Sequence, residues 1–143
     1  MPRSAFVAFV ALSACTGKTT DDTGVPDDGQ PHITILSPTD GEIVGTCPVL
    51  QVKFQNFTLV DYTTTPDPVD GEGHWVVDFG DRYFVCEAFT CAVDLTGQVE
   101  GPLTLVAKLV LSDHNPVYND EGDVVKDEVS VEYVADGCGD TGV

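Results

Sequence analysis

Three histidines and a large set of carboxylates are the residues of this chain that could bind a metal ion. Its 143 residues include 3 His and 24 Asp and Glu, against only 6 Lys and Arg. Imidazoles beside carboxylates suit zinc or copper, whereas loops that offer only oxygen atoms suit calcium. His74 and His114, with Asp113 next to the second, are therefore the candidate transition-metal ligands. The segment 119–123 only partly matches a calcium loop, because it lacks the distal Glu.

The sequence gives no comparable sign of an active site. No reactive Ser or Cys stands beside a plausible base, and no Gly-rich phosphate loop follows a strand and opens a helix. Asp22-Thr23-Gly24 and Asp140-Thr141-Gly142 repeat the tripeptide of aspartic proteases. That chemistry needs two carboxylates held rigidly on apolar loops, whereas these lie in a polar stretch and a Gly-rich tail. We therefore predict that the protein is not an enzyme and uses no cofactor.

The formal net charge of −18 limits the partners. A chain this acidic repels nucleic acid and anionic lipid head groups, so nucleic acid is not an expected partner. The acidity serves solubility and spacing from an anionic surface, or alternatively binds divalent cations.

The first 15 residues have the pattern of an export signal. Arg3 precedes an apolar run from Ala5 to Ala11 that is too short to span a bilayer, and small residues follow it. The segment Leu12-Ser13-Ala14-Cys15 resembles the lipobox of bacterial lipoprotein signals. The resemblance implies cleavage before Cys15, lipidation of Cys15 and a membrane anchor of two or more acyl chains. Thr16, where an Asp would signal inner-membrane retention, implies the outer membrane; the resemblance leaves the periplasmic or surface face open.

The rest of the chain divides by composition. Residues 1–14 are the expected signal peptide, and 15–31 the acylated cysteine with an acidic, flexible tether. A single domain is expected over 32–135, followed by a C-terminal tail over 136–143. Within the domain, apolar residues alternate with polar ones in seven short segments: 33–35, 50–54, 75–79, 82–86, 91–95, 103–111 and 129–133.

Seven short alternating strands over about 100 residues are typical of an all-β, immunoglobulin-like antiparallel sandwich. Residues 32–134 resemble the immunoglobulin-like or fibronectin type III-like modules of bacterial envelope lipoproteins. The segments Gly71-Glu72-Gly73-His74-Trp75 and Asp113-His114-Asn115-Pro116 resemble a pair of segments that recurs in small exported sandwiches. The antibody-type disulfide between the second and sixth strands cannot form, because the sixth strand has no cysteine.

The topology implied by this resemblance predicts where the cysteines, the histidines and the acidic loops lie. It puts Cys47 and Cys138 at the same end of the sandwich, which predicts a Cys47–Cys138 disulfide beside a local Cys86–Cys91 disulfide. Four cysteines allow three connectivities, so the other two pairings stay open. At the opposite end it brings together His74, His114, His32 and two acidic loops.

Two functions follow as hypotheses. The first is a non-enzymatic envelope lipoprotein, held to the membrane by its lipid anchor, whose domain binds an unknown protein or glycan or has a structural role. The second is a periplasmic or surface protein that binds copper, zinc or calcium at the acidic, His-containing loop end.

Overall fold

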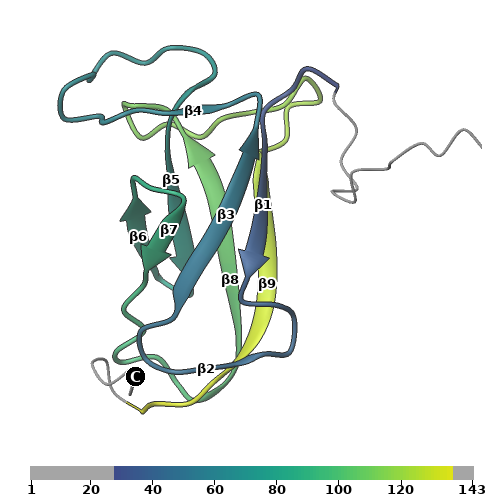
Figure 1. Ribbon diagram of the computed structural model, residues 1–143, viewed down its shortest axis with the longest axis vertical. Helices are drawn as coiled ribbons and strands as arrows, with labels where there is room; N and C mark the ends of the chain where they lie inside the picture. The colour runs from purple at the N-terminus through teal and green to yellow at the C-terminus, as the bar shows by residue number, and fades with distance from the viewer. Residues whose placement is uncertain (1–27, 137–143) are drawn as a thin grey trace, which may run out of the picture.

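The computed structural model describes residues 28–136, and all regular structure in this range is strand (Figure 1). No helix in these residues is long and apolar enough to cross a membrane. Seven strands have three or more residues, and two more, β2 and β4, have two residues each. In order they are β1 His32–Ser37, β2 Ile43–Val44, β3 Val49–Gln55, β4 Thr58–Leu59, β5 Glu72–Phe79, β6 Arg82–Cys86, β7 Thr90–Ala92, β8 Gly101–Val110 and β9 Lys126–Tyr133.

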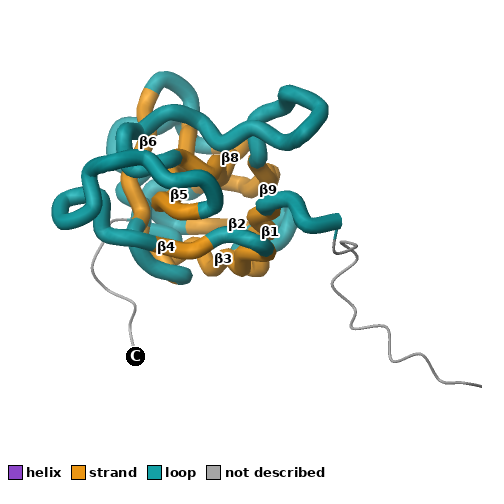
Figure 2. The backbone as a smooth tube through the Cα atoms, turned by 90° about the horizontal axis from the view of Figure 1, so that it is seen from above, coloured by secondary structure: helices purple, strands orange, loops and turns teal. Residues whose placement is uncertain are grey.

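The strands form two sheets that face each other (Figures 1 and 2). One sheet has the order β1-β3-β7, and the other has the order β2-β9-β8-β5-β4, with β6 also paired to β5. All pairs between the longer strands are antiparallel, and only β2 and β4 pair in parallel. The predicted all-β class with antiparallel sheets is confirmed, although the sheets form a curled half-barrel and not a regular immunoglobulin sandwich. The sheets curl together at one side, where Ile35 N–H donates to the Asp127 carboxylate over 2.8 Å.

The core lies between the sheets and is built by the alternation in the sequence. On β5, Trp75, Val77 and Phe79 point inward and are almost completely buried. The inward positions Leu105, Ala107 and Leu109 of β8 are fully buried as well. Side chains on successive residues of a strand point to opposite faces, so this one pattern fixes the register of both strands.

The segment predicted as a strand over 91–95 is shorter in the structure, where β7 ends at Ala92. Val93 N–H still donates to the Pro48 carbonyl over 2.9 Å, and Val93 and Leu95 are fully buried. The apolar alternation therefore continues into the core beyond the regular ladder.

The Cys86–Cys91 disulfide is present, as predicted. It closes the connection between β6 and β7 over the core tryptophan: Cys86 pairs with Trp75 across the strands, and Trp75 Nε1–H donates to the Ala88 carbonyl over 2.8 Å. Cys47 is also disulfide-bonded. Its predicted partner, Cys138, lies outside the described residues, as does the predicted lipidation site Cys15, so both predictions stand as predictions.

Candidate functional site

The predicted approach of His74 and His114 is realised at the end of the sandwich where β5 begins and β8 ends. His74 Nε2 and His114 Nδ1 are 3.1 Å apart and share a hydrogen bond. The two rings cross almost at right angles, with centroids 4.8 Å apart. His74 lies on the face of β5 that points away from the core, because its neighbour Trp75 points inward.

His74 is nevertheless completely buried, and its Nδ1 has no hydrogen-bond partner in the described part of the chain. Burial, and secondarily the neighbouring His114, lowers the pKa of His74 from 6.5 to about 4. An imidazole in this environment is neutral at pH 7, because desolvation disfavours its charged form.

Tyr62, which the sequence analysis did not single out, completes this cluster. Its ring centroid lies 4.7 Å from that of His74 and 4.9 Å from that of His114. A turn in the long connection between β4 and β5 positions it: the Asp61 carboxylate accepts hydrogen bonds from Thr63 N–H and Oγ1–H, at 2.8 and 2.6 Å. These bonds lower the pKa of Asp61. The only signal in the sequence was an aromatic residue inside a polar loop.

His114 is held by a tight turn in the connection between β8 and β9. Its N–H donates to the Leu111 carbonyl, and Leu111 N–H donates to the Asn115 carbonyl, both over 2.9 Å. His114 adopts a positive φ of 67°, which is uncommon for a residue with a side chain. The contacts with His74 and Tyr62 help to hold this conformation, because strained backbone persists only where its surroundings over-determine it.

Asp113, the third residue of the predicted metal site, is hydrogen-bonded to Asn115 and not to either histidine. Its two carboxylate oxygens accept bonds from Asn115 N–H and Nδ2–H, at 3.1 and 2.7 Å. Across residues 28–136, no group of three or more His, Cys, Asp or Glu is arranged to hold a metal ion. The structure thus brings together two of the three predicted ligands, His74 and His114, and leaves Asp113 in a turn.

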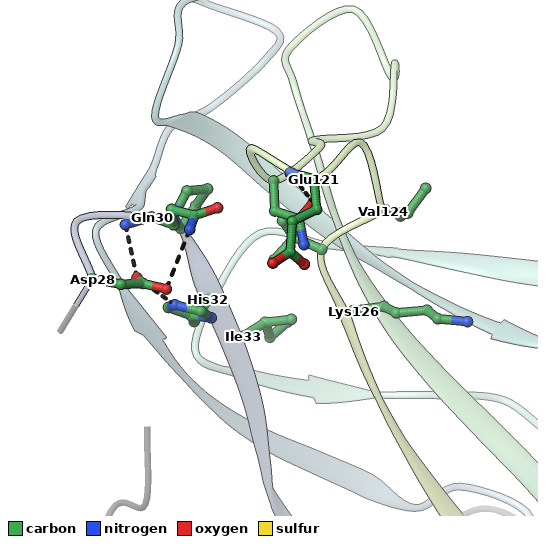
Figure 3. Close-up of a pocket in the computed structure, with 10 residues that line it drawn as sticks. Asp28, Gln30, His32, Ile33, Glu121, Val124 and Lys126 are labelled. Atoms are coloured by element: carbon green, nitrogen blue, oxygen red, sulfur yellow. Dashed lines mark hydrogen bonds and ion pairs between the residues drawn. The ribbon is translucent and has the colours of Figure 1, made fainter. Parts of the chain in front are cut away.

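His32 lies at the same end of the sandwich but belongs to a different pocket. Its Nε2 is 2.8 Å from the Asp28 carboxylate, and this hydrogen bond lowers the pKa of Asp28. Glu121 and Lys126 line the same pocket of about 230 Å³, and Figure 3 shows the side chain of Lys126 extending away from the Asp28–His32 pair.

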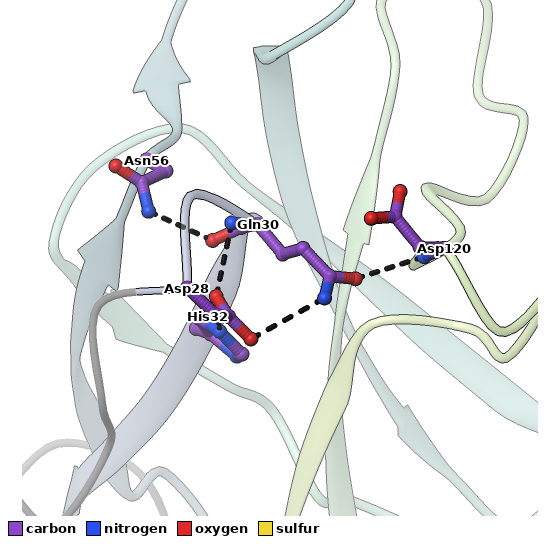
Figure 4. Close-up of polar contacts among 5 residues, drawn as sticks. All are labelled: Asp28, Gln30, His32, Asn56 and Asp120. Atoms are coloured by element: carbon purple, nitrogen blue, oxygen red, sulfur yellow. Dashed lines mark hydrogen bonds and ion pairs between the residues drawn. The ribbon is translucent and has the colours of Figure 1, made fainter.

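Gln30 fixes this region to the sandwich (Figure 4). Its carbonyl accepts a bond from Asn56 Nδ2–H at 3.0 Å, and its side-chain oxygen accepts one from Asp120 N–H at 2.8 Å. The Asn119 amide oxygen, the first of the calcium-like segment, accepts bonds from Glu121 N–H and Asp123 N–H. The Asn119 side chain therefore stabilises a turn. Gln30, which the sequence analysis assigned to the tether, is hydrogen-bonded to the domain.

A second concave site lies on the outward face of β5, β6 and β8, which we call the outer groove. It encloses about 220 Å³. On its floor, Lys108 and Asp78 form an ion pair, and the buried side chains of Val76 and Val110 provide apolar surface. The outer groove is lined by Val76, Asp78, Tyr83, Lys108, Val110, His114 and Pro116.

Comparison with known proteins adds little to this description. No protein family model matches the chain, and no curated protein matches it either. One solved structure, an endo-β-1,4-mannanase from Thermotoga petrophila, matches this chain with a TM-score of 0.49 and 15% sequence identity. The match covers 80% of this chain and 22% of that chain, so it bears on neither activity nor ligand.

Proposed function

We propose that this protein is a lipid-anchored envelope protein whose immunoglobulin-like domain acts by binding and not by catalysis. The observation that carries the binding role is the outer face of the larger sheet, where side chains of β5, β6 and β8 and of the connection between β8 and β9 line a groove instead of leaving a flat solvated surface. Concave sites that combine apolar surface with a few polar groups are the usual form of ligand sites.

The anchor is the other half of the proposal. The lipobox-like segment ends at Cys15, and the described domain begins at residue 28. The intervening 12 residues could extend to at most about 40 Å, so a lipid on Cys15 would keep the domain close to the membrane surface.

Metabolic labelling of the full chain with a fatty-acid analogue in a Gram-negative host tests the anchor. The full chain is expected to carry the label and to sediment with membranes, and Cys15→Ser is expected to lose both properties. Ser13→Ala is the matched control, because it keeps a small residue in the lipobox. A full chain that stays unlabelled, or a Cys15→Ser variant that stays labelled, contradicts the proposal.

Metal binding is the second candidate function, and the 3.1 Å contact between His74 and His114 is the observation that favours it. Two imidazoles are two of the ligands that copper or zinc requires. Native mass spectrometry of the exported chain with copper, zinc or calcium tests this. One metal ion per chain, lost in both His74→Ala and His114→Ala, would support it, whereas retention in both variants would refute the transition-metal version.

A further inference from the structure

We propose that the outer groove binds a ring of a neutral sugar within an oligosaccharide or polysaccharide. The inference rests on the proposed binding function and gives it a site and a ligand class. The groove runs diagonally across three strands: Tyr83 on β6 is directly opposite Asp78 on β5, and Val76 on β5 is opposite Lys108 on β8. His114 and Pro116 close the other end.

Tyr83 supplies an aromatic platform. Its side chain is 69% exposed although it lies beside the buried Val76 and Val110. A tyrosine presents an apolar ring face with a polar tip, and leaving such a ring in water forgoes the free energy of its burial. A pyranose matches this surface, because its axial C–H groups form an apolar face while its hydroxyl groups stay at the ring's edge.

The polar groups of the groove suit hydroxyls and not ions. Asp78 and Lys108 are paired with each other, so their charges cancel locally. Together they offer acceptors and donors, which is what a sugar hydroxyl needs, since it both accepts and donates. The net charge of −18 disfavours an anionic ligand at any part of this surface.

The buried histidine pair adds a defined donor. If His74 carried its proton on Nδ1, a buried N–H group would have no partner, and such orphan donors are rarer than orphan acceptors. We therefore assign the His74 proton to Nε2, which donates to His114 Nδ1. Because His114 Nδ1 accepts this bond, its Nε2 carries a proton, so a groove-lining residue presents an N–H donor.

The backbone argues against an extended peptide in the same groove. β5 is paired on both sides, with β6 and β8, and β8 is paired with β5 and β9. Peptides that add to a sheet are bound by main-chain groups at a free edge, and β5 and β8 have none over the groove. Among the described strands β6 pairs only with β5, so its free edge lies at the margin of the sheet and not on the groove floor. Recognition here must come from side chains.

NMR titration of the exported chain with neutral hexasaccharides tests the site. The probes are cellohexaose, mannohexaose and maltohexaose, with an oligogalacturonate as the anionic counterpart. We expect at least one neutral probe to bind with a dissociation constant of about 1 mM or tighter and to shift amide signals of β5, β6 and β8. Tyr83→Ala is expected to weaken binding at least about tenfold, which corresponds to one aromatic contact.

Tyr118→Ala is the matched control, because Tyr118 is similarly exposed, at 57%, but does not line the outer groove. The proposal is overturned if no neutral probe binds at about 10 mM, or if Tyr83→Ala binds as well as Tyr118→Ala. A short aromatic peptide that shifts the same signals more strongly than every sugar would assign the groove to a protein partner instead. None of these outcomes alters labelling at Cys15, so failure of the sugar site and failure of the anchor are distinguishable.

Discussion

The eight residues of β5 form two faces, and these faces are covered in different ways. Toward the core, Trp75, Val77 and Phe79 pack against an opposing sheet of strands. On the other face, His74 and Val76 are also buried, but no second sheet of the described residues covers this face. Instead, Tyr62 and His114 of two connecting segments contact His74, and Val76 lines the outer groove.

This difference separates a framework from the surface that we propose to bind a ligand. The inner face gains its stability from close packing of apolar side chains between two hydrogen-bonded sheets. The outer face depends on one turn around Asp61, one turn at His114 and the ring contacts of Tyr62. Segments held by few contacts open at lower free energy than core strands, so the outer face is expected to be the adaptable one.

The largest expected effect is on the inner face. Trp75→Ala should lower the free energy of unfolding by about 3–5 kcal/mol, because it leaves a cavity and an unpaired Ala88 carbonyl beneath the disulfide. Urea unfolding measures this, with Tyr118→Ala as a surface control. A loss below about 1 kcal/mol would mean that the inner face is not the framework.

Burial of His74 on the outer face should make the free energy of unfolding depend on pH. The unfolded chain binds a proton at His74 near pH 6.5, and the folded chain only near pH 4, so unfolding takes up a proton between these values. This contribution to stability is complete above pH 6.5 and falls by up to about 3 kcal/mol as the pH drops toward 4.

His74→Gln should flatten that part of the stability profile relative to the unmodified chain, while Tyr118→Ala, at an exposed surface position, should not. The measurement is chemical unfolding at several pH values between 4 and 7. The difference between the two variants isolates His74 from the many carboxylates that titrate in the same range. Parallel profiles for all three proteins would show that His74 is not buried as a neutral imidazole.

The Cys86–Cys91 disulfide should matter less than the tryptophan beneath it. Replacing both cysteines with serine is expected to cost about 2 kcal/mol, because the closed loop is short and the bridge removes little entropy from the unfolded chain. Thermal unfolding of the double variant and of Trp75→Ala gives the comparison. A larger loss in the double variant would make the bridge, and not the core, the main support of β6.

The smallest expected difference is in the free energy of unfolding of variants at two neighbouring residues of β5. Val77→Ala should cost about 2 kcal/mol on the inner face, and Val76→Ala about 1 kcal/mol on the outer face, because connecting segments can settle into the vacated space more easily than a packed sheet can. Urea unfolding of the two variants side by side checks it. Equal losses would mean that both faces are packed to the same degree.

Much of this fold could be predicted from period-two alternation. Turn residues between apolar segments located all seven main strands, and the resemblance to immunoglobulin-like modules supplied the sheet order that put His74 and His114 together. The local disulfide was accessible for the same reason, since a short connection between adjacent strands leaves its two cysteines close.

The outer face could not be predicted in this way. Alternation assigns the outward positions of a sandwich strand to solvent, so nothing in the sequence indicated that His74 and Val76 would be buried. Tyr62 and Pro116 act on this face from loops, where no periodic pattern reports which way a side chain points. Asp113 was misleading for a similar reason, because an Asp in a turn satisfies neighbouring backbone groups as readily as it binds a metal.

The sequence by itself determined the all-β class, the inward face of each main strand and the short disulfide, because these depend on period and proximity along the chain. Only the tertiary structure decided that two distant loops fold back over the sheet and bury a neutral histidine, and that His114 and Pro116 of one of these loops line a groove beside Tyr83. Those features depend on contacts between residues as far apart as Tyr62 and His114. Such contacts become favourable only once the strands between them have paired and the entropy of closing the intervening chain has been overcome.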